Sequence, residues 1–99
     1  MITKDQIIFL LNQNIAEIKR RFTVRRIGLF GSFARGEAIG KSDIDFIVDF
    51  EQPTFDHYMD LKFFLEDLFH HEVDLVLADS LKPRLKSYID REIVYAQGL

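Results

Sequence analysis

The sequence predicts a fold that contains both helices and strands, of the α/β (α+β) class. In this fold, helices flank a small mixed β-sheet. The length of 99 residues suits one domain that spans residues 1–99. Segments with apolar residues at helical spacing alternate along the chain with short runs of β-branched and apolar residues. This alternating order of helices and strands predicts a sheet that is covered by helices.

The N-terminal third predicts a helix followed by a strand. We expect the helix from about Lys4 to Arg21, because apolar residues recur there at helical spacing. Thr3 and Gln6 match a capping box at its start. Residues 24–30 are a β-branched and apolar run that ends at a glycine, which predicts the first strand.

The middle of the chain predicts a helical turn, a loop and a second strand. One or two helical turns are expected over residues 32–37, followed by a loop over residues 38–42. Acidic and apolar residues alternate over residues 43–50, which predicts the second strand. Residues 51–54 include a proline, and we expect them to interrupt the regular secondary structure.

The last third predicts a helix, a strand and a final helix. Asp56 is the expected cap of the first of these, whose apolar residues have helical spacing. The third strand is expected over residues 72–78. A helix over residues 81–91 tolerates a proline in its first turn. Residues 93–96 either extend that helix or form a short strand.

Composition excludes several classes of function. The chain has no cysteine, which excludes disulfides, thiolate chemistry and zinc sites built on cysteine. No run approaches the roughly 20 apolar residues of a membrane span, and no leader pattern is seen at the start. From Leu29 to Asp79 there are twelve acids and three bases, which argues against nucleic-acid binding and favours a cation site. We expect a cytoplasmic protein with no membrane partner.

Asp43 and Asp45 lie two residues apart on the second predicted strand, so their side chains point to the same face. Two carboxylates about 7 Å apart along a strand repel each other unless a cation lies between them. Mg²⁺ prefers carboxylate oxygens together with substrate phosphates and water, and this pair can supply the protein's share. Taken alone, the pair is more readily explained as two solvent-facing acids.

Gly31 and Ser32 lie at the turn between the first strand and the helical turns. The first backbone N–H groups of a helix lack internal partners and can bind phosphate, and glycine permits a close approach. Taken alone, the turn is better explained by Ser32 acting as a helix N-cap. Arg35 either reaches the phosphates or pairs with Glu37 or another acid, and the sequence does not choose between these alternatives.

Asp74 is a lone acid in a strand that is otherwise apolar. A carboxylate in such a run is unfavourable unless it is paired or bound to metal. If the third strand lies beside the second, Asp74 joins Asp43 and Asp45 as a third carboxylate. The alternative is an acid at the end of a strand that caps a neighbouring turn.

The combination of these features is far rarer by chance than any one of them. Ten residues separate Ser32 from Asp43, the acid pair follows, and Asp74 lies on a later strand. In this pattern the chain resembles the DNA polymerase beta-type nucleotidyltransferase superfamily, from about Ile7 to Val94. The run Gly-Ser-Phe-Ala-Arg-Gly and the short chain are similar to the minimal nucleotidyltransferase (MNT) domains, the antitoxin halves of HEPN/MNT toxin–antitoxin pairs.

The resemblance implies a nucleotidyltransferase fold and a site. Gly31 and Ser32 would hold the β- and γ-phosphates of ATP, and Arg35 is assigned to nucleotide binding with them. Asp43, Asp45 and Asp74 would be the catalytic carboxylates and the ligands of Mg²⁺, with two ions expected. Asp74 would also position the attacking hydroxyl. AMP would then pass from ATP to that hydroxyl, and pyrophosphate would leave.

The resemblance also implies a partner. In the antitoxin families the acceptor is a tyrosine of the partner HEPN ribonuclease, which is silenced by adenylylation. Many relatives append a helical domain that grips the base and the acceptor, whereas this chain ends at Leu99. We therefore expect the partner to complete the site. Two other functions stay open: a non-catalytic antitoxin that masks its toxin by direct binding, and a small-molecule nucleotidyltransferase.

Overall fold

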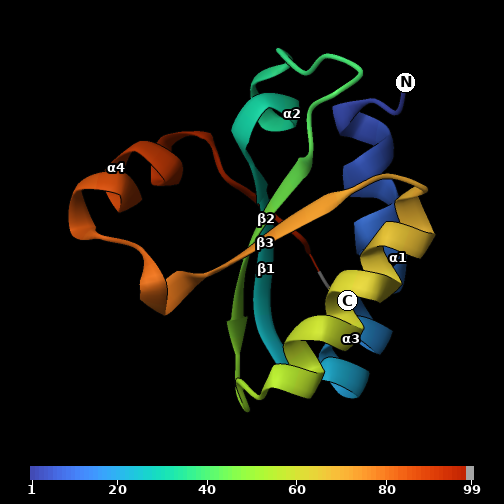
Figure 1. The fold of residues 1–99 in the computed structure, drawn as a ribbon, viewed down its shortest axis with the longest axis vertical. Helices are drawn as coiled ribbons and strands as arrows, with labels where there is room; N and C mark the ends of the chain where they lie inside the picture. Colours follow the sequence, from blue (N-terminus) through green and yellow to red (C-terminus); the bar gives the residue numbers. More distant parts are fainter. Residues whose placement is uncertain (98–99) are drawn as a thin grey trace.

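Helices lie on both sides of a four-stranded sheet in the computed structural model, which describes residues 1–97 (Figure 1). The strands run in the spatial order β3-β2-β1-β4. They are β1 (Val24–Phe30), β2 (Ile44–Phe50), β3 (Val73–Leu77) and β4 (Val94–Tyr95). Because β1 is antiparallel to β2 and β4 while β2 and β3 are parallel, the expected mixed sheet is confirmed.

Two long helices cover one side of this sheet. Figure 1 shows α1 and α3 on that side, α4 on the other side, and α2 near the end of β1. The helices are α1 (Lys4–Phe22), α2 (Gly31–Arg35), α3 (Phe55–Phe69) and α4 (Pro83–Glu92). A short 3₁₀ turn, Ala78–Ser80, lies between β3 and α4. Among residues 1–97, no helix combines the length and the apolar character that a membrane crossing needs.

The caps of the two long helices give one confirmation and one correction. The capping box of α1 is present, since the backbone N–H of Gln6 donates to the Thr3 hydroxyl at 3.2 Å and Gln6 Oε1 accepts from the Thr3 N–H at 2.9 Å. The prediction that Asp56 caps α3 is wrong. Thr54 is the N-cap, because its hydroxyl accepts from the His57 N–H at 3.1 Å. Asp56 lies inside the first turn.

Some predicted boundaries move by one or two residues. Strand β2 begins at Ile44, so Asp43 lies just before the strand and not within it. Strand β3 ends at Leu77, because the backbone turns into the 3₁₀ segment there. The last helix begins at Pro83, whose fixed φ suits the first helical position. Of the two alternatives for residues 93–96, the short strand is the correct one.

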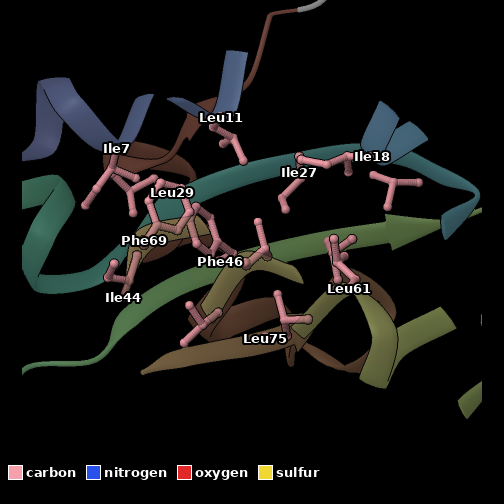
Figure 2. Packing of buried hydrophobic residues seen from close by; sticks show 14 of the residues in the cluster. Ile7, Leu11, Ile18, Ile27, Leu29, Ile44, Phe46, Leu61, Phe69 and Leu75 are labelled. Atoms are coloured by element: carbon pink, nitrogen blue, oxygen red, sulfur yellow. The ribbon is translucent and has the colours of Figure 1, made fainter. Parts of the chain in front are cut away.

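The hydrophobic core fills the space between the sheet and the two long helices (Figure 2). Alternate residues of β2 point into it, and Phe46 is fully buried and stacks on Phe69 with ring centroids 5.7 Å apart. Helix α1 buries one stripe of side chains at helical spacing against the sheet. The fully buried members of the core are Ile7, Leu11, Ile18, Leu29, Ile44, Phe46, Leu61 and Leu65, each 0% exposed.

The packing is one-sided, and this asymmetry positions the site. The intervening residues of β2 and β3 point away from the core, to the side on which α4 lies. Helix α4 buries none of its own residues. Just after the end of α4, Ile93 lies against Gly28 of β1. A Cβ added to this glycine would come within 2.8 Å of the Ile93 side chain. We call this second side, with Asp45 and Asp74 on it, the open face of the sheet.

Candidate active site

Asp45 and Asp74 are register partners across the parallel pair of strands β2 and β3. Their strand neighbours Ile44 and Val73 are also register partners, and both are buried in the core. Because side chains alternate along a strand, both acids lie on the open face. The structure therefore places Asp74 beside Asp45, as expected if the third strand lies next to the second.

The electrostatics of Asp45 show that the acids are neighbours. The pKa of Asp45 is raised from 3.8 to about 6, first by partial burial and then by the negative charges of Asp74 and Asp43. The positive charge of Arg35 opposes this rise only in part. Asp43 is exposed just ahead of β2 and still acts on Asp45 through its charge. A bound cation would relieve this repulsion.

Gly31 lies against the Asp45 carboxylate. Its φ of +79° lies in the left-handed region, which glycine adopts without a steric penalty. A Cβ built at this position would lie 3.1 Å from Asp45 Cγ and closer still to Oδ2. The residue before it, Phe30, is the register partner of Asp45, which explains why the turn meets this side chain. Only a residue without a side chain fits here.

Ser32 lies within helix α2, next to Gly31. The residue at the N-cap position is Phe30, which provides no side-chain hydrogen bond to the helix. The alternative explanation of Ser32 as the N-cap is therefore wrong. The half-buried Ser32 stays a candidate for phosphate binding.

Arg35, at the end of α2, binds two carboxylates. Its Nε donates to Glu37 Oε1 at 2.6 Å, and its Nη1 donates to both oxygens of Glu92, at 3.0 and 3.1 Å. These hydrogen bonds raise the pKa of Arg35 above its ordinary value, and the bond with Glu37 has the largest effect. Of the alternatives that the sequence left open for Arg35, pairing with acids is the one present in the free protein, and phosphate binding by Arg35 stays a prediction.

Glu92 is the residue that sequence reasoning missed. It is the last residue of α4, and its Oε2 accepts a hydrogen bond of 2.5 Å from the backbone N–H of Gly31. Sixty-one positions separate these two residues in the sequence. No local spacing signals this contact, because it depends on α4 returning across the open face so that β4 can pair with β1.

The chemical type of the ligand atoms at this site suits a divalent cation. Asp43, Asp45 and Asp74 provide only carboxylate oxygens, which Mg²⁺ prefers, and their mutual repulsion favours a cation between them. Among residues 1–97, no group of three acids and histidines is already close enough together to hold a metal by itself. Phosphate oxygens and water would complete the coordination of a magnesium ion here, as they commonly do.

Comparison with known proteins gives matches over nearly the whole chain. The family described as nucleotidyltransferase domain matches residues 11–96. Protein adenylyltransferase MntA of Thermococcus cleftensis is 43% identical over 96 residues, which cover 96% of this chain and 97% of that protein. This match spans nearly all of both chains.

Solved structures match the fold. A structure assigned as a minimal nucleotidyltransferase superposes with a TM-score of 0.79 at 33% identity, covering 94% of this chain and 95% of the other. A chain from the complex of a tri-AMPylated Shewanella oneidensis HEPN toxin with its MNT antitoxin has a TM-score of 0.64 at 22% identity. That match covers 93% of this chain and 73% of the other, and at this identity it shows the fold alone.

Proposed function

Because this chain belongs to the nucleotidyltransferase domain family, we propose that it transfers AMP from ATP to a hydroxyl group of a partner protein. The family assignment makes the chain an enzyme, a nucleotidyltransferase. The proposal adds the donor ATP, a Mg²⁺ requirement, a tyrosine acceptor on a HEPN-type toxin, and an antitoxin role.

One observation carries the proposal. Asp45 and Asp74 lie side by side on the open face of the sheet, and the Gly31 turn meets the Asp45 carboxylate directly. A triphosphate at this turn would therefore lie beside the carboxylates. Nucleotidyl transfer needs this proximity, because charge develops on phosphate oxygens while the phosphorus changes partner.

The residues would act as follows. Gly31, Ser32 and Arg35 would bind the β- and γ-phosphates, so that pyrophosphate is held as the leaving group. Asp74 is exposed and would orient the acceptor hydroxyl and take its proton as the new O–P bond forms on the α-phosphorus. The bond between the α-phosphorus and the bridging oxygen then breaks. Asp43 and Asp45, together with Asp74, would form the set of three carboxylates at the site.

Mg²⁺, when bound by Asp43, Asp45 and Asp74, would neutralise phosphate charge and stabilise the attacking and leaving oxygens. The half-buried position of Asp45 strengthens the argument for a cation. A carboxylate whose pKa is raised to about 6 by burial and by two neighbouring acids is poorly stabilised as an anion by the protein alone.

The partner is proposed from the relatives. MntA of Thermococcus cleftensis is named a protein adenylyltransferase, and the Shewanella oneidensis HEPN toxin is tri-AMPylated in complex with its MNT antitoxin. Both descriptions join AMP transfer to a protein target. We therefore expect the acceptor of this chain to be a HEPN-type toxin, with the chain as its antitoxin, and the family resemblance adds a tyrosine as the expected acceptor residue.

The test is a labelling experiment with a HEPN-type toxin as the candidate acceptor. With Mg²⁺, label from ATP radioactive at the α-phosphate should enter the partner, whereas label at the γ-phosphate should not. The double variant Asp43→Asn plus Asp45→Asn should lose the transfer. Asp49→Asn is the matched control, since Asp49 lies on the same strand but takes no part in the proposed site. No labelling, or labelling that the double variant retains, would overturn the proposal.

A second candidate, neutralisation by binding alone, is favoured by the exposed apolar side chains. Phe9 is 60% exposed, Phe55 76% and Phe63 58%, and such residues suit a protein partner. Cell protection by the Asp43→Asn plus Asp45→Asn variant separates the two functions. Full protection without labelling supports masking, and loss of protection supports the enzyme.

A further inference from the structure

We propose that Glu92 is an internal competitor for the triphosphate of ATP, holding the phosphate-binding groups until the nucleotide displaces it. This inference rests on the proposed function, which assigns Gly31 and Arg35 to phosphate binding. In the free protein both groups are already bound to one carboxylate. Glu92 Oε2 accepts from the Gly31 N–H at 2.5 Å, and Arg35 Nη1 lies 3.0 and 3.1 Å from the two Glu92 oxygens.

The chemistry of this contact is that of a bound phosphate. A carboxylate and a phosphate both present several negatively charged oxygens, and both take backbone N–H groups and guanidinium groups as donors. A backbone N–H carries one hydrogen, so its hydrogen bond cannot be used in full by Glu92 and by a phosphate oxygen together. Nucleotide binding at Gly31 therefore requires that Glu92 moves away.

The negative charges of the site also disfavour the presence of the Glu92 carboxylate and a triphosphate at the same time. The Glu92 carboxylate is close enough to Asp45 to help raise the pKa of that residue. A triphosphate would bring further negative charge to the same place. Coulomb repulsion between Glu92 and the phosphates would then weaken binding unless the glutamate withdraws.

Glu92 can withdraw without disturbing the core. Its side chain is 21% exposed and that of Arg35 is 47% exposed, so water can replace both partners. Helix α4, which ends at Glu92, buries none of its residues. Release of Glu92 therefore exposes little apolar surface, and the main interaction lost is the hydrogen bonding to Gly31 and Arg35.

Calorimetric titration of the full chain with Mg·ATP and with AMP tests the proposal. Glu92→Gln removes the charge and keeps the size of the side chain. We expect it to bind Mg·ATP about tenfold more tightly than the wild type, the scale of one charge-assisted hydrogen bond. AMP has neither the β- nor the γ-phosphate, so its affinity should not change. Glu37→Gln is the matched control, because Glu37 binds Arg35 but not Gly31.

Three results would overturn the proposal. Glu92→Gln binding Mg·ATP as weakly as the wild type, or more weakly, would show that Glu92 supports the site and does not compete for it. Equal tightening for ATP and AMP would exclude competition at the β- and γ-phosphates. Failure of wild type and Glu92→Gln alike to bind Mg·ATP would leave no nucleotide for Glu92 to compete with and would overturn this inference, whereas labelling of the partner tests the proposed function.

A second measurement needs no variant and so does not depend on Glu92→Gln folding. The side-chain carboxyl ¹³C resonance of Glu92 in the wild type should move when Mg·ATP is added. That of Glu17 should stay in place, because Glu17 pairs with Arg21 on α1, away from the site. An unmoved Glu92 resonance with ATP bound would contradict the competition.

Discussion

Gly31 and Asp45 are in contact, and the contact leaves no room for a side chain on the glycine. The atoms nearest to a Cβ added at Gly31 would all belong to the Asp45 side chain, with Cγ at 3.1 Å and Cβ at 3.2 Å. The turn after β1 and the central acid of β2 therefore depend on each other. A change in one of these residues should alter both the stability of the fold and the site.

Replacement of Gly31 by alanine should be more destabilising than the same change at Gly36. Both glycines have positive φ, +79° and +72°, so both alanines would be strained by about 1–2 kcal/mol. At Gly36 an added Cβ meets nothing within 4 Å, whereas at Gly31 it must displace the Asp45 carboxylate. We expect about 3 kcal/mol for Gly31→Ala, measured by urea unfolding. Equal losses for the two variants would contradict the contact.

Asp45→Asn should stabilise the metal-free protein at pH 7. A carboxyl whose folded pKa is raised from 3.8 to about 6 binds its proton more tightly when folded, so its ionisation destabilises the fold as pH rises through this range. Since the group is partly solvated, we expect roughly 1 kcal/mol at pH 7. With EDTA present, the advantage of Asp45→Asn should disappear below about pH 4.

Thermal unfolding at several pH values measures this difference. Asp49→Asn, on the same strand, is the control and should not reproduce the pH dependence. If Asp45→Asn were less stable than the wild type at pH 7, the carboxylate would be a stabilising group, and the repulsion inferred from its neighbours would be wrong.

Mg²⁺ should raise the melting temperature of the wild type, because a ligand that binds only the folded state stabilises it. The shift should be smaller in Asp74→Asn and absent in Asp43→Asn plus Asp45→Asn. Differential scanning calorimetry with Mg²⁺ and with EDTA gives both values. A full shift in the double variant would place the cation somewhere other than these acids.

Thr54→Ala should destabilise the protein by about 1 kcal/mol, since it removes the side-chain acceptor at the start of α3. Asp56→Ala should have a smaller effect, because Asp56 lies inside the helix and acts there only through its charge near the N-terminal end. Urea midpoints of the two variants compare them directly. A larger loss for Asp56→Ala would restore Asp56 as the cap.

The sequence was sufficient to predict that Asp45 points to the face of the sheet away from the core. Apolar residues alternate with Asp45 on one strand and surround Asp74 on another, and a strand sends alternate residues to opposite faces. That the two strands are neighbours, with these residues in register, needed the structure. Register depends on how the whole strands pack, which local patterns do not state.

Other details lay beyond local patterns for identifiable reasons. Thr54 and Asp56 are both good N-cap residues only two positions apart, so propensity alone did not separate them. Glu92 meets Gly31 only because the chain returns at β4 to the edge of β1. Its position in an exposed, polar helix looks like that of an ordinary surface acid.

The one-sided packing has a consequence for the history of such chains. The side chains that hold the protein together lie between the sheet and helices α1 and α3, and the acids lie on the opposite surface. Substitutions of the exposed Asp43 or Asp74 that silence the reaction therefore leave the packing of the core in place. An inactive descendant of this protein could persist as a well-folded scaffold, free to be selected for recognition alone.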